Sequence, residues 1–238
     1  GILYKYSLRY AKKVIFQNYD DMKLFVEKKY IPESKCEKVD GSGVNMDRFS
    51  FTELLDSKLF IMISRIIKEK GVFEFCKAAE IVKRKYPDSR FMLLGGYDKS
   101  IGAIKPEELD QYIENGIIEV PGEVKDVSPI LREAYVFVLP TYYREGIPRT
   151  ILEAMASGKP VLTTDWVGTK EAVEDGVNGF LVPIRDYKML SEKMIYMLEH
   201  YDETKNMGQK SYELCCEKFD VNIVNRKMIQ IMGIKEDV

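Results

Sequence analysis

The sequence contains one histidine among 238 residues, and its four cysteines show no metal-ligand spacing. Zinc sites need several His or Cys ligands, and a catalytic triad needs a histidine beside its nucleophile. A histidine-based zinc site and a catalytic triad are therefore nearly excluded. Cys76 and Cys215 lie on apolar helical stripes, so we expect buried free thiols and a reducing compartment rather than a framework of disulfides.

Long apolar runs and an excess of one charge are also missing. No apolar segment approaches the ~20 residues that a membrane-spanning helix needs. Lys and Arg number 36 and Asp and Glu 38, which gives a formal net charge of −2, and no basic arm is visible. The sequence therefore gives no indication of a nucleic-acid partner. With 45% hydrophobic and 31% charged residues, the composition is that of an ordinary globular protein.

A G-x-G-x-x-G pattern is absent as well. The glycine pair in LLGG (93–96) follows a strand-like run, but no acid stands where one would bind the ribose of NAD. The sequence thus argues against a dinucleotide-dependent oxidoreductase.

From Leu59 onward, short apolar runs alternate with helical patterns. Strands are expected at 59–64, 90–96, 116–120, 135–140 and 161–163, and helices at 72–86, 106–115 and 127–133. This alternation predicts the α/β class, with a Rossmann-like, mostly parallel sheet and helices on both faces. Because ligands of such sheets bind at the carboxyl ends of the strands, four loops should share one rim. These loops follow Ser64, Leu94, Val120 and Pro140.

Three further helical patterns follow Pro183. An Asp just before a helical run is a favoured N-cap, because its carboxylate accepts hydrogen bonds from the first free N–H groups. Asp186, Asp202 and Asp220 are the expected caps.

The stretch 141–183 carries the densest cluster of polar groups. Glu145 lies in the loop after the strand 135–140, Pro148 is expected as the first residue of a helix, and Glu153 falls in its second turn. The unpaired N–H groups of this helix start suit an anion. Two carboxylates beside an anion suit a ligand with hydroxyls on both sides of its phosphates, such as a nucleotide sugar. Alternatively, Glu153 only complements the helix dipole and Glu145 is solvated.

The segments EGIPRTILE (145–153) and SGKPVLTTDWVGTKEAVEDGVNGFLVP (157–183) resemble the C-terminal signature of the retaining, group-one glycosyltransferases (family four, GT-B fold). In that signature two glutamates, here Glu145 and Glu153, are separated by seven residues. The resemblance implies the C-terminal half of a GT-B fold, which binds a nucleotide sugar without a metal or other cofactor. Pro148 is a departure, because many members have EGFG where this sequence has EGIP, and proline offers no N–H.

The resemblance also implies roles for single residues. Arg65 and Lys70, in SRIIKEKG, would contact the diphosphate, with Lys68 as a weaker neighbouring candidate. Glu145 would orient the sugar hydroxyls and Glu153 the ribose, so that Arg65, Lys70 and Glu145 form the catalytic set. The other expected substrate-binding residues are Pro121 and Gly122 in the nucleobase loop, and Gly146, Ile147, Arg149 and Thr150 around the helix start. Without the resemblance, the two cations would be taken as exposed surface charges.

The sequence before Leu59 resembles the last pieces of a GT-B N-terminal domain, with GSGVN (41–45) in place of the hinge loop. We expect residues 1–50 to be the remnant of that domain with the hinge, 51–220 the nucleotide-sugar-binding domain, and 221–238 a C-terminal helix. The chain would then be a fragment of a longer enzyme and inactive by itself. The alternative is a small βαβ lead-in that is native to a complete protein.

EGIPRT after YYR resembles the members that build bacterial surface polysaccharides and glycans on lipid carriers. We therefore expect a UDP-sugar donor and transfer of a hexose or N-acetylhexosamine to a glycan or polyprenyl-linked acceptor, held mainly by the missing domain. The enzyme would be cytoplasmic, with peripheral association at the inner face of the membrane. Two alternatives stay open: a nucleotide-sugar epimerase of similar fold, which needs no acceptor, and a non-catalytic nucleotide-sugar-binding module.

Overall fold

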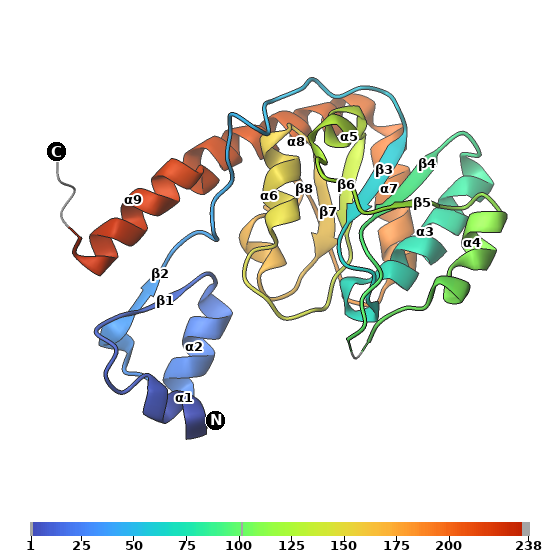
Figure 1. Cartoon of the computed structure of the whole chain (residues 1–238). Helices are drawn as coiled ribbons and strands as arrows, with labels where there is room; N and C mark the ends of the chain where they lie inside the picture. Colours follow the sequence, from blue (N-terminus) through green and yellow to red (C-terminus); the bar gives the residue numbers. More distant parts are fainter. Residues whose placement is uncertain (1, 101, 235–238) are drawn as a thin grey trace.

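The computed structural model describes residues 2–100 and 102–234, and its largest feature is a six-stranded parallel sheet (Figure 1). Its strands are β3 (Leu59–Ile63), β4 (Arg90–Leu94), β5 (Glu119–Gly122), β6 (Val136–Leu139), β7 (Val161–Thr164) and β8 (Gly179–Val182). They lie in the order β5-β4-β3-β6-β7-β8, and every neighbouring pair is parallel. The order reverses between β3 and β6, as in a doubly wound fold, and the α/β, Rossmann-like prediction is confirmed.

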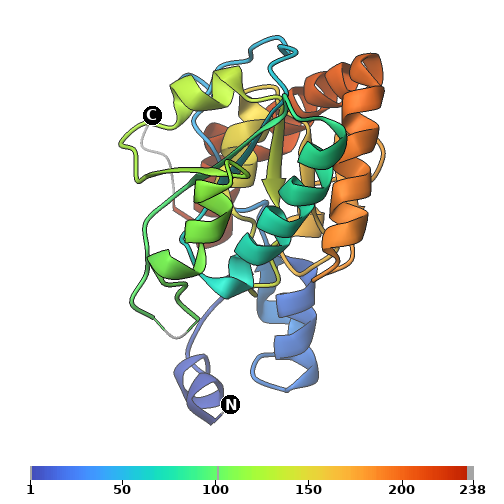
Figure 2. The same ribbon diagram turned by 90° about the vertical axis from the view of Figure 1, so that its right-hand side faces the viewer.

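Helices cover both faces of this sheet (Figures 1 and 2). One face carries α3 (Val72–Lys85), α4 (Asp110–Glu114) and α7 (Tyr187–Glu199). The other carries α6 (Arg149–Ala156) and α8 (Tyr201–Leu214), which pack against each other, while α5 (Ser128–Glu133) connects β5 to β6. Of the described helices, none is long and apolar enough to cross a membrane.

The strands are apolar on both sides because both faces are covered. Every residue of β3, β6 and β7 is buried. Phe60 of β3 stacks on Phe91 of β4 with ring centroids 5.1 Å apart, and Phe75 of α3 meets Phe91 edge-on at 5.9 Å. Cys76 and Cys215 are buried free thiols, as predicted, and burial raises the pKa of each to about 12.

The strand predicted at 116–120 is displaced and forms instead as β5 at Glu119–Gly122. The cause lies at the end of α4. Gly116 adopts a left-handed conformation, with φ of 65°, and the N–H groups of Ile117 and Ile118 both donate to the carbonyl of Tyr112. Residues 116–118 therefore satisfy free carbonyls of the helix end, and the chain can pair with β4 only afterwards.

Two predicted helix starts also need correction. Pro148 is extended, with φ of −61° and ψ of 125°, and precedes α6, which begins at Arg149. α7 ends at Glu199 and α8 begins at Tyr201, so the residue at the N-cap of α8 is His200 and not Asp202. Asp186 and Asp220 do cap α7 and α9 (Val221–Met232), as predicted.

A second, smaller part, which we call the N-terminal unit, comprises residues 2–40. It contains α1 (Ile2–Ser7), β1 (Val14–Phe16), α2 (Tyr19–Glu27), the short 3₁₀ helix η1 (Glu33–Lys35) and β2 (Cys36–Lys38), with β1 and β2 paired in parallel. The chain leaves this unit along 41–45, where Val44 exchanges backbone hydrogen bonds with Phe219 and Val221 at the start of α9. Figure 1 shows α9 returning above the N-terminal unit. Residues 1 and 235–238, the ends of the predicted first and last segments, lie outside the described residues.

Lys159 is a fully buried cation at the amino ends of the strands, just before β7. Its ammonium donates to the carbonyl of Arg132 at 2.9 Å, in the last turn of α5, and no carboxylate within the described ranges pairs with it. Burial lowers the pKa of Lys159 to about 8. The charged form of Lys159 therefore destabilises the folded state at neutral pH.

We expect Lys159→Met to unfold at a higher urea concentration than the wild type at pH 7. An unfolded lysine has a pKa of about 10.4, so between pH 8 and pH 10 the unfolded chain binds more protons than the folded one, and the wild type gains stability as pH rises. The advantage of the variant should thus shrink by roughly 2 kcal/mol between pH 7 and pH 9.5. Both proteins contain the same buried thiols, so thiol titration does not affect the difference in stability between them. A stability difference that does not change with pH would contradict the lowered pKa of Lys159.

Candidate functional site

The crevice at the point where the strand order reverses lies outside the carboxyl ends of β3 and β6. Two loops flank it, residues 64–71 after β3 and residues 140–148 after β6. They are tied together, because the Thr141 hydroxyl and the Tyr142 N–H both donate to the carbonyl of Glu69, at 3.0 and 2.8 Å. Ligands of doubly wound sheets bind at this crevice.

Lys70 and Glu145 meet across these two loops. The Lys70 ammonium pairs with a carboxylate oxygen of Glu145, and the two side chains are only 9% and 28% exposed. Lys70 ends the short 3₁₀ helix η2 (Lys68–Lys70), and its ammonium lies 5.3 Å from the centre of the Tyr143 ring. The structure thus brings together Lys70, which follows β3, and Glu145, which follows β6, although they are 75 positions apart in the sequence.

Arg65 also contacts this ring, with its guanidinium 5.6 Å from the centre of Tyr143. It pairs with Asp98 at 2.8 Å, and this hydrogen bond raises the pKa of Arg65. Asp98 follows β4, accepts N–H groups from Lys99 and Ser100, and has a lowered pKa through the Ser100 and Arg65 bonds. Asp98 is not among the residues predicted from the sequence, although the turn that an acid begins in YDKS could have indicated it.

Lys68 does not join this cluster. Its side chain lies 3.8 Å from Glu108, outside the crevice. Lys68 is therefore a suitable control position for substitutions of Lys70.

The N-terminus of α6 faces the crevice without a side-chain cap. Within the described ranges, the N–H groups of Arg149 and Thr150 have no hydrogen-bond partner, since the first bonded amide is that of Ile151. Free amides and the helix dipole together favour an anion here. Gly146 and Ile147 precede the helix, and the Ile147 side chain is buried.

Glu153 lies one turn further along α6 and is half-buried. No hydrogen bond or ion pair involves its carboxylate in the part of the chain that the structure describes. Burial raises the pKa of Glu153, and the nearby charges of Arg149 and Arg48 partly oppose this. Such a carboxylate has its acceptor positions available for hydroxyl groups.

A pocket of about 320 Å³ opens beside these residues. It is lined by the ends of three strands and the start of α6, through Ser64, Arg65, Gly95, Gly96, Glu123, Val124 and Thr150, among others. Three of the four predicted rim loops therefore border one cavity. Pro121 and Gly122, expected in the nucleobase loop, are instead the last two residues of β5, and the pocket is lined by the next two residues.

The family model described as "Glycosyl transferases group 1" matches residues 57–200, more than half of the chain and all of the elements just described. The chain belongs to this family.

The chain is similar to several curated glycosyltransferases. The N,N'-diacetylbacillosaminyl-diphospho-undecaprenol alpha-1,3-N-acetylgalactosaminyltransferase of Campylobacter jejuni is 28% identical over 96% of this chain and 62% of its own length. The putative colanic acid biosynthesis glycosyltransferase WcaL of Salmonella typhimurium is 27% identical over 80% of this chain and 49% of its own. The chain thus spans about half to two thirds of the curated relatives it matches.

Solved structures confirm the fold. HepE from Anabaena, in complex with UDP, superposes with a TM-score of 0.83 at 21% identity, over 95% of this chain and 65% of that one. A glycosyltransferase from Rickettsia africae superposes with a TM-score of 0.83 at 20% identity, over 99% and 68%. The domain is therefore a Rossmann-like domain of the GT-B kind, as expected.

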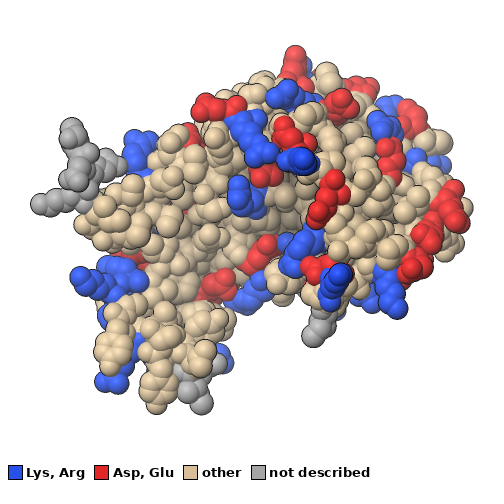
Figure 3. Space-filling view, viewed as in Figure 1, with Lys and Arg blue, Asp and Glu red and all other residues tan. Residues whose placement is uncertain are grey.

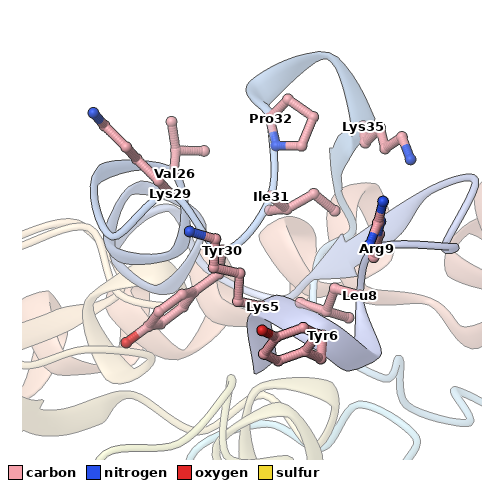
Figure 4. Close-up of a pocket in the computed structure, with 10 residues that line it drawn as sticks. All are labelled: Lys5, Tyr6, Leu8, Arg9, Val26, Lys29, Tyr30, Ile31, Pro32 and Lys35. Atoms are coloured by element: carbon pink, nitrogen blue, oxygen red, sulfur yellow. The ribbon is translucent and has the colours of Figure 1, made fainter. Parts of the chain in front are cut away.

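A second cavity, of about 820 Å³, lies between α1 and α2 (Figure 4). Its lining comes only from residues 5–35, so it is separate from the crevice at β3 and β6. Over the surface shown in Figure 3, positive and negative side chains are interspersed. The described residues of this face therefore form no extended patch of a single charge.

Proposed function

We propose that residues 51–220 bind a nucleotide sugar, with UDP as the nucleotide, in a retaining, metal-independent glycosyltransferase that builds bacterial surface glycans. The observation that carries this proposal is that Lys70 pairs with Glu145 while Lys70 and Arg65 both lie against Tyr143, at the crevice between β3 and β6. Arg65 also lines one pocket with Thr150, whose N–H has no partner among the described residues. The Lys70 and Arg65 cations suit the phosphates of such a donor, and the Glu145 and Glu153 carboxylates suit its hydroxyls.

The parts of the donor can be assigned along the crevice. The 320 Å³ pocket would take the base, held by groups of 95–96 and 123–124. Glu153 would accept the ribose hydroxyls, because its carboxylate is half-buried and has no partner among the described residues. The diphosphate would lie among Arg65, Lys70 and the amides of Arg149 and Thr150.

Glu145 would hold the transferred sugar. It lies in the loop rather than on α6, and its ion pair with Lys70, the proposed diphosphate ligand, supports this role. A lysine ammonium has three N–H donors, so Lys70 can contact Glu145 and a phosphate oxygen together. When the bond between sugar and diphosphate breaks, negative charge grows beside Lys70 and Arg65, and this is the charge that they stabilise.

The relatives support the choice of donor and acceptor class. One relative's name states transfer of N-acetylgalactosamine to a diphospho-undecaprenol-linked sugar, and a structural neighbour is described in complex with UDP-glucose. We accordingly propose a hexose or N-acetylhexosamine as the group transferred and a glycan or polyprenyl-linked acceptor. Peripheral association with the inner face of the membrane belongs to the same proposal.

We expect UDP to bind this chain equally well in EDTA and in Mg²⁺. Arg65, Lys70 and the α6 amides supply the positive charge, and no group of three or more His, Cys, Asp or Glu among the described residues is placed to hold a metal. Calorimetric titration with UDP in either buffer tests this, with GDP as the control nucleotide. Binding that appears only with Mg²⁺ or Mn²⁺, or that does not distinguish UDP from GDP, would contradict the proposal.

A further inference from the structure

The loop that carries Glu145 is in contact with the N-terminal unit. The side-chain amide of Asn18 donates to the backbone carbonyl of Glu145 at 3.3 Å. Asn18 is only 1% exposed. Its oxygen accepts the N–H of Asp21 at 2.7 Å and so caps α2, and its nitrogen also donates to the Asp21 carboxylate at 2.9 Å.

Further contacts surround the same backbone. Arg144 forms an ion pair with Asp21 at 2.7 Å. A Cβ atom added to Gly146 would lie 1.9 Å from the side-chain oxygen of Gln17, and one added to Gly168, in the turn after β7, would lie 2.6 Å from the Glu145 carbonyl oxygen. The loop therefore lies between two elements: a side chain at Gly168 would collide with its backbone, and one at Gly146 would displace the Gln17 side chain.

Among the residues that the structure describes, the second half of this loop makes almost no backbone hydrogen bonds of its own, so its position depends on contacts with other elements. Residues 141–143 are held to the β3 loop through the Glu69 carbonyl and the Thr141 hydroxyl. For residues 144–147, by contrast, the bond from Asn18 is the one hydrogen bond that the backbone makes within the described ranges. Regular secondary structure does not begin again until Arg149.

We propose that Asn18 is a positioning residue for Glu145. By holding the Glu145 carbonyl, it fixes the direction in which the carboxylate leaves the loop, toward Lys70 and the proposed sugar position. The N-terminal unit thereby sets affinity for the sugar part of the donor, while UDP is bound by the larger domain alone. This inference rests on the proposed nucleotide-sugar site.

Alternatively, Asn18 only caps α2. The substitution Asn18→Ser separates this capping from the contact with the Glu145 carbonyl. Serine is as good an N-cap as asparagine, so α2 keeps its cap, but its shorter side chain does not reach the Glu145 carbonyl. Lys170→Gln is the matched control. It removes the neighbouring ion pair between the same two parts, Lys170 to Asp20 at 3.1 Å, without changing a contact of residues 144–147.

The test is calorimetry of the wild type and both variants with UDP, UDP-glucose, UDP-N-acetylglucosamine and UDP-N-acetylgalactosamine. We expect Asn18→Ser to keep the UDP affinity within about twofold and to lower affinity for the preferred UDP-sugar about three- to tenfold, the effect of one hydrogen bond. Lys170→Gln should change neither. Equal losses for UDP and UDP-sugar, no loss for either, or a wild type that binds UDP and all three sugars equally would overturn the inference.

Nuclear magnetic resonance relaxation supplies a readout that needs no ligand and no hydrogen-bonded amide. The backbone order parameters of residues 144–147 should be lower in Asn18→Ser than in the wild type or Lys170→Gln, with those of the sheet unchanged. Unchanged order parameters would overturn the positioning role. If the wild type binds no UDP at all, the proposed function fails, and the order parameters still decide whether Asn18 holds the loop.

Discussion

Replacing Lys70 by methionine is expected to lower both the stability of the chain and its affinity for UDP. The variant leaves the partly buried carboxylate of Glu145 without its partner. Breaking a fully buried pair costs 3–5 kcal/mol, and because Glu145 is 28% exposed we expect about 2 kcal/mol in urea unfolding. Loss of a charge-assisted hydrogen bond to the diphosphate should weaken UDP about tenfold to a hundredfold in calorimetry.

The double variant Lys70→Met/Glu145→Gln separates the two losses. It removes the unpaired charge of Glu145, so most of the stability should return. Its affinity for UDP should stay low, because the Lys70 ammonium is still missing. Lys68→Met is the matched control, since Lys68 is exposed and lies by Glu108 outside the crevice. Recovery of UDP affinity in the double variant, or an equal loss in the control, would show that Lys70 is a structural residue only.

The two glutamates should respond differently to replacement by glutamine. Glu153 is assigned to the ribose, which UDP and UDP-sugars share, so Glu153→Gln should weaken both by about tenfold to a hundredfold. Glu145 is assigned to the sugar. Glu145→Gln should not weaken UDP, because it releases Lys70, but it should lower the affinity for the preferred UDP-sugar. A loss of UDP affinity in Glu145→Gln as large as in Glu153→Gln would show that the roles are wrongly assigned.

The pH dependence of binding gives an independent check on Glu153. Burial raises its pKa, so its carboxylate begins to take up a proton above the usual range of a glutamate as pH falls. Binding needs the ionised form as hydrogen-bond acceptor, and affinity for UDP-glucose should therefore fall between pH 7 and pH 5. The slope should be absent in Glu153→Gln. UDP-glucose is preferred to UDP here because a terminal phosphate itself titrates near pH 6.

Much of the fold followed from the sequence because buried parallel strands and amphipathic helices have strong local patterns. The same patterns placed Lys70 and Glu145 at one rim, since the carboxyl ends of parallel strands share an edge. Their direct pairing did not follow, because it depends on the contact of Glu69 with Thr141 and Tyr142, residues distant in the chain.

The remaining differences have the same origin. The displacement of β5 reflects hydrogen bonds that residues 117 and 118 make to the end of α4. The Arg65–Asp98 pair joins two loops, and Asn18 reaches Glu145 across 127 positions of sequence. None of these contacts leaves a periodic trace in the sequence, so only the folded chain shows them.

A crystal structure of this chain with UDP would test the central claim most directly. We expect the base in the pocket bordered by Gly96 and Glu123, the ribose hydroxyls on Glu153, and the diphosphate within hydrogen-bond distance of Lys70 and the Thr150 N–H. UDP seated elsewhere, for example in the cavity between α1 and α2, or a diphosphate that touches neither Lys70 nor the start of α6, would contradict the account.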